Sequence, residues 1–359
     1  MGANLNKACW HWLRFALPLR APLPSGGRVR QGGVVIVEAE GMRGWGEVAP
    51  LPGLSLETLE EAEQALKACI CRLPNQLPEH PELLAAVLKD VLRAVPASVR
   101  WGIELALAGW MAAWTGKRLD AWLAPSPLPV VAVNALIASE ADPSALLALR
   151  EAGYSVVKLK VGRQSLAADI QRVRQVRAVL GPKVEIRLDA NRAWKLSEAL
   201  AFAEAVADLH IAYLEEPVKN VEDLAAFAHR SPIPLALDET LAAFPEQPLA
   251  NWAFARVVVL KPMCLGGVFC ALERAREAQA LGMQVVWSSA FESGVGTRGV
   301  LALAAASQSH AAAGLDPYRW LAADTVWPSL ALGPIVSVPE VLGQKLTCNQ
   351  RMLTHGFSA

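Results

Sequence analysis

The feature that most constrains this chain is a regular alternation of short apolar strands and amphipathic helices, beginning at Val130. Such alternation predicts a parallel sheet, and eight units closing on themselves predict a (β/α)8-type barrel, a modified TIM barrel. An open doubly wound sheet would carry a Gly-rich phosphate turn after its first strand, and VNALIASEADP (133–143) contains none. The predicted strands are Val130–Ile137, Ser155–Val161, Val184–Asp189, Ala212–Glu215, Leu235–Asp238, Arg256–Lys261, Gln284–Ser289 and Ala313–Asp316.

The segments on either side of this alternation predict a second structural unit. Residues 1–125 combine β-rich and helical patterns and predict an α+β capping domain, and residues 126–316 form the barrel. The alternation stops after Asp316, and we expect residues 317–359 to pack back on the capping domain. The fold class is therefore α/β, a barrel with a cap formed by the N-terminal region and the C-terminal tail.

Within the cap, the sequence predicts two antiparallel strands and several helices. The strands are 15–19 and 32–40, separated by a Pro- and Gly-rich loop at 18–33. Residues 44–63 begin as a second loop, and Ser55 is the predicted N-cap of the helix that follows. Two further helical patterns cover 83–95 and 98–115.

Composition excludes several classes of function. The 34 basic and 34 acidic residues balance, without the basic stripe of a nucleic-acid-binding protein. The six cysteines form neither a CxxC pair nor a zinc spacing, so they are predicted to be reduced. No segment is apolar and long enough to span a membrane, and the first twenty residues lack the continuous apolar run of a signal peptide. We expect a cytoplasmic protein; its oligomeric state is not determined by the sequence, and a monomer is compatible with it.

Polar residues stand at the ends of the predicted barrel strands. In RLDANRAW (187–194), Arg187, Asp189 and Asn191 share one face, because side chains alternate along a strand. This stretch alone fits a salt-bridged strand end or a ligand site. Five other strands also end in polar residues, at intervals of 23 to 29 residues, and active sites of such barrels collect at the C-terminal strand ends. The predicted site therefore contains Lys158, Lys160, Asp189, Glu215, Asp238, Lys261, Ser288 and Ser289.

Three carboxylates on adjacent strands, Asp189, Glu215 and Asp238, predict a divalent cation, because like charges this close repel one another. Oxygen ligands unaccompanied by His or Cys favour Mg²⁺ over zinc, with Mn²⁺ as the alternative ion. The neighbours predicted to orient these ligands are Asn191, Glu216 and Glu239.

Lysines flank the predicted metal site on both sides. Lys158 and Lys160 are two residues apart and point into the barrel interior, whereas Lys261 lies four strands later and approaches from the opposite side. Repulsion between these cations is predicted to lower the pKa of a lysine toward that of a useful base. These parts suit abstraction of a proton α to a carboxylate: a lysine moves the proton and the metal offsets the charge of the enediolate.

These motifs resemble the enolase superfamily in its muconate-lactonising-type branch, whose pairing of a lysine base with Mg²⁺ is a known pattern. Within that branch, the chain resembles the o-succinylbenzoate synthases, and a GWGEVAPLPGLSLET segment (44–58) resembles their capping loop. The motifs that carry the resemblance are KLK (158–160), LDAN (188–191), LEEP (214–217), LDE (237–239), LKP (260–262) and SSAFESGVG (288–296).

The resemblance implies a role for each matched residue. Asp189, Glu215 and Asp238 would bind Mg²⁺, Lys160 would take the α-proton and assist loss of hydroxide, and Lys261 would stay charged beside the enediolate. The implied reaction dehydrates 2-succinyl-6-hydroxy-2,4-cyclohexadiene-1-carboxylate to 2-succinylbenzoate, in menaquinone or phylloquinone biosynthesis. The small-molecule carboxylate substrate would be positioned by Lys158, Arg187, Asn191, Ser288 and Ser289.

Three other functions use similar parts. An N-acylamino acid racemase or dipeptide epimerase also needs bases on both faces of its substrate, but GLDPYRW (314–320) lacks the DxD that epimerases of this branch carry at the eighth strand. A cycloisomerase or sugar-acid dehydratase is a further alternative. An inactive metal-binding barrel would be expected to have lost a charged strand end, and all six are present.

Overall fold

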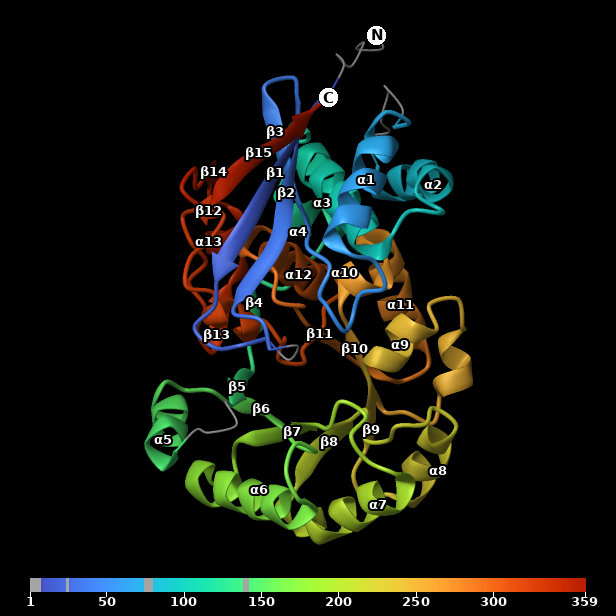
Figure 1. The fold of residues 1–359 in the computed structure, drawn as a ribbon, viewed down its shortest axis with the longest axis vertical. Helices are drawn as coiled ribbons and strands as arrows, with labels where there is room; N and C mark the ends of the chain where they lie inside the picture. The colour runs from blue at the N-terminus through green and yellow to red at the C-terminus, as the bar shows by residue number, and fades with distance from the viewer. Residues whose placement is uncertain (1–7, 24–25, 74–79, 138–141) are drawn as a thin grey trace.

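The structure is a computed structural model that describes residues 8–23, 26–73, 80–137 and 142–359. Residues 1–7, part of the segment predicted to lack a signal peptide, lie outside the described part, as do 24 and 25 of the predicted loop at 18–33. Figure 1 shows an antiparallel sheet with helices packed beside it, placed over a parallel sheet whose outer face is covered by helices. All six cysteines are free thiols, as expected.

The barrel sheet contains seven parallel strands in the order β11-β10-β9-β8-β7-β6-β5. An eighth segment closes it, because Gly314 bridges Ser288 after β11 and Ala313 bridges Val133 before β5, both in parallel. This arrangement confirms the predicted barrel. The strands are β5 (Ala135–Ile137), β6 (Val156–Lys160), β7 (Glu185–Asp189), β8 (Ile211–Glu215), β9 (Leu235–Leu237), β10 (Val257–Leu260) and β11 (Gln284–Trp287).

Each barrel strand is buried on both faces, as expected for a parallel sheet inside a layer of helices. Tyr213, Val259 and Val286 belong to a cluster inside the barrel. Alternate residues such as Leu188 and Leu214 instead belong to the main core shared with the helices. The covering helices are α5 (Pro143–Glu151), α6 (Leu166–Leu180), α7 (Leu196–Ala205), α8 (Asp223–Arg230), α11 (Val268–Ala280) and α12 (Gly294–Ala306), with short helices α9 (Glu239–Ala243) and α10 (Pro262–Leu265) after β9 and β10.

The first and last predicted strands needed correction. Val130–Ile137 is not one strand: β4 (Val130–Ala132) pairs antiparallel with β13 (Ile335–Ser337), and only β5 joins the barrel. The predicted strand Ala313–Asp316 contributes only its first two residues, and a 3₁₀ helix begins at Asp316. The Asp316 carboxylate accepts a hydrogen bond from the Leu136 N–H at 2.8 Å, replacing the missing strand partner.

The cap is a four-stranded antiparallel sheet in the order β15-β1-β2-β3, with helices α1 (Leu59–Ile70), α2 (Pro81–Val91), α3 (Ala97–Trp114) and α4 (Leu119–Leu123). The strands are β1 (Cys9–Pro18), β2 (Val29–Ala39), β3 (Met42–Val48) and β15 (Leu353–Ser358). Because β15 pairs with β1, the C-terminal segment completes the cap sheet (Figure 1). The last segment also contains β12 (Val326–Trp327), α13 (Val338–Leu342) and β14 (Thr347–Cys348).

Two details of the cap differ from prediction. The predicted loop at 44–63 begins as β3, whose glycines are required because α3 packs against this strand: a Cβ on Gly46 would lie 1.9 Å from the Gly102 carbonyl oxygen. The first helix is capped by Thr58, not Ser55. Thr58 forms a full capping box with Glu61, whereas the Ser55 hydroxyl accepts a hydrogen bond from the Leu51 N–H.

The close packing of α3 on β3 gives a matched pair of expected results. Gly102→Ala should lower the free energy of unfolding by about 1–3 kcal/mol, because its Cβ would lie 2.4 Å from a methyl group of Val48. Gly109→Ala, in the same helix, has its nearest neighbour at 3.8 Å and should raise it by up to about 1 kcal/mol through helix propensity. Urea unfolding checks both values; equal effects at the two positions would contradict the packing argument.

Candidate active site

The charged residues predicted for the site stand on one rim of the barrel. Lys160, Asp189 and Glu215 are the last residues of β6, β7 and β8, and Asp238 and Lys261 directly follow β9 and β10. In sheet order, the three carboxylates therefore lie on neighbouring strands, with a lysine strand on each side. This order is a consequence of parallel strands, whose C-terminal ends meet at the same edge.

Ion pairs link the lysines to the carboxylates. The Lys158 Nζ lies 2.7 Å from a Glu215 oxygen and 3.1 Å from an Asp189 oxygen. Lys261 forms an ion pair with Asp238. The Lys160 Nζ lies 3.8 Å from Asp189 Oδ2 and donates a hydrogen bond to the Asn191 side-chain oxygen at 2.9 Å. Lys158, Asp189 and Glu215 thus form the buried centre of the site, and Lys160 is held beside it.

The environments of the two outer lysines shift their pKa values in opposite directions. Burial lowers the pKa of Lys160, and the nearby Lys158 and Lys261 ammonium groups add to this effect against the opposing attraction of Asp189. Burial also acts to lower the pKa of Lys261, but the adjacent Asp238 outweighs it and the pKa is raised. In this arrangement Lys160 therefore holds its proton less tightly than Lys261 does.

The carboxylates also differ. Burial and the proximity of Asp189 raise the pKa of Glu215. Burial alone would raise the pKa of Asp189, but the Lys158 and Lys160 ammonium groups outweigh it and lower this pKa to about 2. The pKa of Glu215 is thus raised while that of Asp189 is lowered. Both carboxylates can be ionised at once only when positive charge lies close to them.

The three residues predicted to orient the ligands have well-defined partners. Asn191 donates to a Glu239 oxygen at 2.8 Å while accepting from Lys160. Glu216 is fully buried and accepts hydrogen bonds from the backbone N–H groups of Asp238 and Thr240 at 2.9 and 2.7 Å. Glu216 thereby holds the backbone that presents Asp238.

Arg192 belongs to this candidate site but was not predicted from the sequence. Its guanidinium donates to Glu216 at 3.1 Å and to the Thr240 hydroxyl at 2.9 Å, so it ties the loop after β7 to those after β8 and β9. Asn191, Arg192 and Glu216 have positive φ values of 42°, 60° and 41°. A left-handed backbone conformation is energetically costly for residues other than glycine, and such residues are concentrated at functional sites. The residue types alone do not predict this conformation.

The donor set fits a hard divalent cation. Three carboxylates converge from adjacent strands, and Glu215 Oε2 is buried without a hydrogen-bond partner. As arranged, the carboxylates face lysine ammonium groups: within the described residues, no three His, Cys, Asp or Glu side chains are gathered tightly enough to hold an ion as they stand. A bound ion would therefore require these lysine contacts to lengthen.

A cavity of about 640 Å³ opens above this rim and is lined by barrel and cap together. Lys160, Asn191, Glu239, Lys261 and Ser289 line its barrel side. The Ser289 hydroxyl is buried and has no hydrogen-bond partner, so it is available to a ligand. The cap side is formed by the loop after β3, through Leu51, Pro52, Gly53, Leu54 and Leu56.

The structure does not bring every predicted substrate-binding residue into this cavity. Arg187 is 1% exposed and lies deeper in the barrel, where it donates to Glu185 and the Ala312 carbonyl at 2.7 Å each and stacks over the Tyr213 ring. Ser288 faces the Gly314 carbonyl at 3.3 Å. Neither residue lines the cavity, and Lys158 lies beneath it on the carboxylates.

A buried polar cluster fastens the cap to the barrel beside this cavity. Glu47 of β3 accepts hydrogen bonds from the Ser293 N–H at 2.8 Å and the Ser293 hydroxyl at 2.6 Å. Arg30 of β2 donates to the Phe291 carbonyl at 3.0 Å. Glu292, between these two contacts, is fully buried, and one of its carboxylate oxygens has no partner.

Glu292 should make stability pH-dependent. Burial, together with the nearby Glu47, raises the pKa of Glu292 from 4.5 to about 7. At a pH between these two values, the Glu292 carboxyl is protonated in the folded state and ionised in the unfolded chain. Stability should therefore fall as pH rises through this window, by up to about 3 kcal/mol at 1.4 kcal/mol per pH unit. In urea unfolding from pH 4 to 8, Glu292→Gln should flatten this slope, and the exposed control Glu340→Gln should retain it. Identical slopes in wild type and Glu292→Gln would contradict the assignment.

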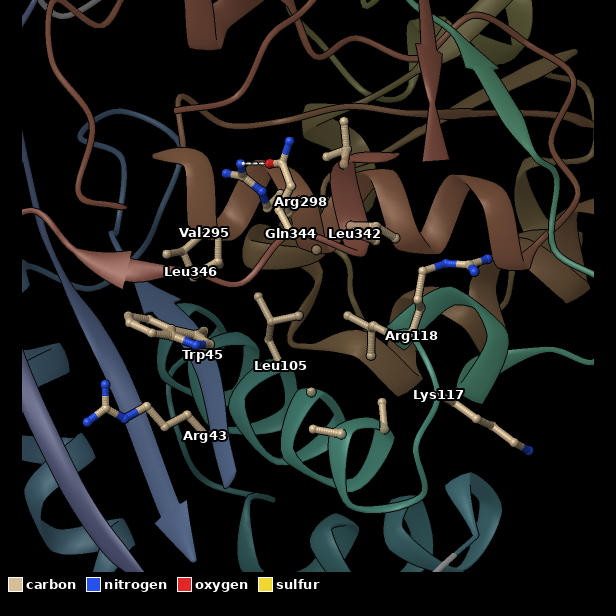
Figure 2. Close-up of a pocket in the computed structure, with 16 residues that line it drawn as sticks. Arg43, Trp45, Leu105, Lys117, Arg118, Val295, Arg298, Leu342, Gln344 and Leu346 are labelled. Atoms are coloured by element: carbon tan, nitrogen blue, oxygen red, sulfur yellow. Dashed lines mark hydrogen bonds between the residues drawn. The ribbon is translucent and has the colours of Figure 1, made fainter. Parts of the chain in front are cut away.

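A second cavity, of about 210 Å³, lies where β3, α3, α12 and the C-terminal segment meet. In Figure 2 the charged ends of Arg43 and Lys117 point away from it, while Trp45, Leu105 and Leu346 face it. Arg118, Arg298 and Gln344 also line it, and no residue of the predicted site does.

Comparison with known proteins decides the family. Residues 143–341 match the family model described as Enolase C-terminal domain-like. The chain belongs to the enolase superfamily. Residues 13–110 match the MenC N-terminal domain, so the cap agrees with the same superfamily. No helix within the described residues is both long and apolar enough to cross a membrane.

Relatives in this superfamily cover most of the chain. The o-succinylbenzoate synthase of Klebsiella pneumoniae (strain 342) is 33% identical over 324 residues, 87% of this chain and 90% of that protein. Protein PHYLLO, chloroplastic, of Arabidopsis thaliana is 31% identical over 345 residues, 84% of this chain, which spans only 20% of that protein.

Solved structures of the superfamily share the fold. Muconate lactonizing enzyme superimposes with a TM-score of 0.85 at 20% identity, covering 98% of this chain and 100% of that one. Dipeptide epimerase from Enterococcus faecalis V583, complexed with Mg and the dipeptide L-Leu-L-Tyr, gives a TM-score of 0.83 at 22% identity, covering 94% and 97%.

Proposed function

We propose that this enolase-superfamily protein is an o-succinylbenzoate synthase of menaquinone or phylloquinone biosynthesis. It would dehydrate 2-succinyl-6-hydroxy-2,4-cyclohexadiene-1-carboxylate to 2-succinylbenzoate. The observation that carries the proposal is the placement of Lys160 and Lys261 on strands that flank three carboxylate-bearing strands, under a cap that matches the MenC N-terminal domain. The synthase relative from Klebsiella pneumoniae supports this choice among the reactions of the superfamily.

The residues would divide the reaction between them. Lys160, whose pKa is lowered by burial, takes the proton from the carbon that bears the ring carboxylate. The same group then returns that proton to the hydroxyl that leaves from the neighbouring carbon, so that water and an aromatic ring are formed. Lys261 would act as an ammonium ion that stabilises negative charge from the opposite side.

Asp189, Glu215 and Asp238 are the residues that would hold a divalent ion, and Mg²⁺ is the ion that their oxygen donors suit. When bound, the ion supplies positive charge beside the substrate carboxylate as its second negative charge develops. Glu216 and Asn191 keep the ligands and Lys160 in position through the hydrogen bonds described above. The Ser289 hydroxyl is available to bind the succinyl carbonyl.

A second candidate is an N-acylamino acid racemase or dipeptide epimerase. The same pair of lysines favours it, because a 1,1-proton transfer needs a base on each face of the substrate. The absence of a DxD in GLDPYRW (314–320) argues against the dipeptide epimerase. A cycloisomerase or a sugar-acid dehydratase would use the same rim, but the relative from Klebsiella pneumoniae, a synthase, does not support either reaction.

The proposal is tested by following the ultraviolet change on aromatisation of the cyclohexadiene substrate, with Mg²⁺ present. We expect turnover that disappears when the metal is chelated. In parallel, N-acylamino acids and dipeptides are incubated in deuterated water, and α-proton exchange is followed by NMR. Exchange without aromatisation would replace the synthase assignment with the isomerase one.

A further inference from the structure

The cavity above the rim is lined by four cationic side chains, and three of them already hold protein partners. Lys160 is held by Asn191, Arg192 by Glu216, and Lys261 by Asp238. The fourth is Arg163, which forms no hydrogen bond or ion pair with any residue that the structure describes. Its exposed guanidinium is therefore the lining cation that is free to bind a ligand anion.

The turn that carries Arg163 is rigidly built. Gly162 has a φ of +80°, and a Cβ there would lie 2.4 Å from the Ala193 Cβ, so only glycine fits. Its N–H donates to the buried Asp169 carboxylate at 2.7 Å, and the Val161 N–H donates to the Asp189 carbonyl at 2.9 Å. Arg163 is thus attached to a well-held backbone three residues after the end of β6.

The opposite wall of the cavity is apolar. It is formed by the cap loop, which contributes Leu51, Leu54 and Leu56, and the Leu56 side chain is 94% exposed. A ligand that fills this space would bury a short hydrocarbon chain against these leucines, between the charged rim and Arg163. The cap loop therefore offers apolar surface to a ligand segment that lies against it.

We propose that Arg163 binds the second, remote carboxylate of the substrate and so selects dicarboxylates over monocarboxylates. This inference rests on the proposed function, whose substrate carries a ring carboxylate and a carboxylate at the end of the succinyl chain. The ring carboxylate meets the rim, the ethylene group of the chain packs on the cap loop, and its terminal carboxylate reaches the guanidinium. Arginine suits this task because it presents paired N–H donors to a carboxylate.

The test compares two ligands that differ only in the remote group. Isothermal titration of the Mg²⁺-loaded protein measures binding of 2-succinylbenzoate and of 2-butanoylbenzoate, in which a methyl group replaces the terminal carboxylate. We expect the wild type to prefer the dicarboxylate by about tenfold at low salt, and the preference to shrink as salt rises. Arg163→Gln should remove most of this preference while leaving the affinity for 2-butanoylbenzoate unchanged.

Arg230→Gln is the matched control. Arg230 is also exposed, and its side chain forms no hydrogen bond or ion pair with a residue that the structure describes. It ends α8 just before β9 begins, on the face of the barrel away from the cavity. This variant makes the same change in net charge and should retain the full preference for the dicarboxylate.

Each outcome separates the two proposals. A preference that persists in Arg163→Gln, or that is absent from the wild type, overturns the assignment of Arg163. A preference that is lost only in Arg163→Gln supports it even when the wild type shows no aromatisation, in which case the synthase reaction alone fails. If Arg163→Gln and Arg230→Gln weaken binding equally, the effect is one of general charge and the inference is wrong.

Discussion

Lys160→Ala is expected to lower kcat of the aromatisation reaction by about 10²–10⁴-fold, the range that a positioned general base contributes. Lys160 is the one lysine of the rim whose pKa is lowered, and its contact with Asn191 leaves the amine at the cavity wall. The measurement is steady-state turnover followed by ultraviolet absorbance. Affinity for 2-succinylbenzoate should change far less than kcat, because the lost group acts in proton transfer.

Lys195→Ala is the control for this variant. Lys195 is exposed, lies outside the cavity and follows the loop after β7, so its loss should leave kcat within about twofold. Circular dichroism should show both variants folded. If Lys160→Ala retained more than about a tenth of wild-type kcat, the proton would have to be moved by another group, and Lys261 would be the next to test.

Glu215→Gln should abolish both metal binding and turnover while keeping the size of the side chain. Glu215 lies on the middle one of the three carboxylate strands. One of its buried oxygens has no hydrogen-bond partner and is therefore free to bind a cation. We expect Mg²⁺ affinity to fall by at least about 100-fold, since even groups behind the ligands contribute 10–100-fold. Titration calorimetry with Mg²⁺ alone provides a readout that is independent of activity.

Removing the metal from the wild-type protein should have the same effect reversibly. EDTA should eliminate turnover, and excess Mg²⁺ should restore it, whereas Mg²⁺ should not restore Glu215→Gln at the same concentration. The exposed Glu340→Gln serves as control and should bind Mg²⁺ like wild type. Mg²⁺ affinity unchanged in Glu215→Gln would exclude this carboxylate as a ligand.

The barrel and the order of charged residues around its rim could be predicted because both follow from local patterns. Strand polarity alone places Lys160, Asp189 and Glu215 at one edge, whatever the helices between them look like. The resemblance to the family could also be recognised from the sequence, because the motifs that carry it are short and lie at the ends of those strands.

What the sequence could not supply was the set of contacts between distant segments. Arg187 was expected to meet substrate, yet one of its two shortest hydrogen bonds goes to the carbonyl of Ala312, 125 residues away. Strand β3 was predicted as a loop because it contains glycines. In the structure these glycines allow α3 to pack closely against the strand. The cap loop and Arg163 line the cavity only once the two parts are packed together, and no periodicity in either segment encodes that packing.

The pairing of β15 with β1 also sets an order of assembly. Because His11 of β1 lies opposite Ser358 of β15, the ribosome delivers the last strand of the cap only after every strand of the barrel has been made. Until then β1 is an open sheet edge, available for pairing with other nascent chains. Completion of the cap sheet, which carries the loop that lines one side of the cavity, therefore follows synthesis of the barrel strands and depends on pairing between segments far apart in the sequence.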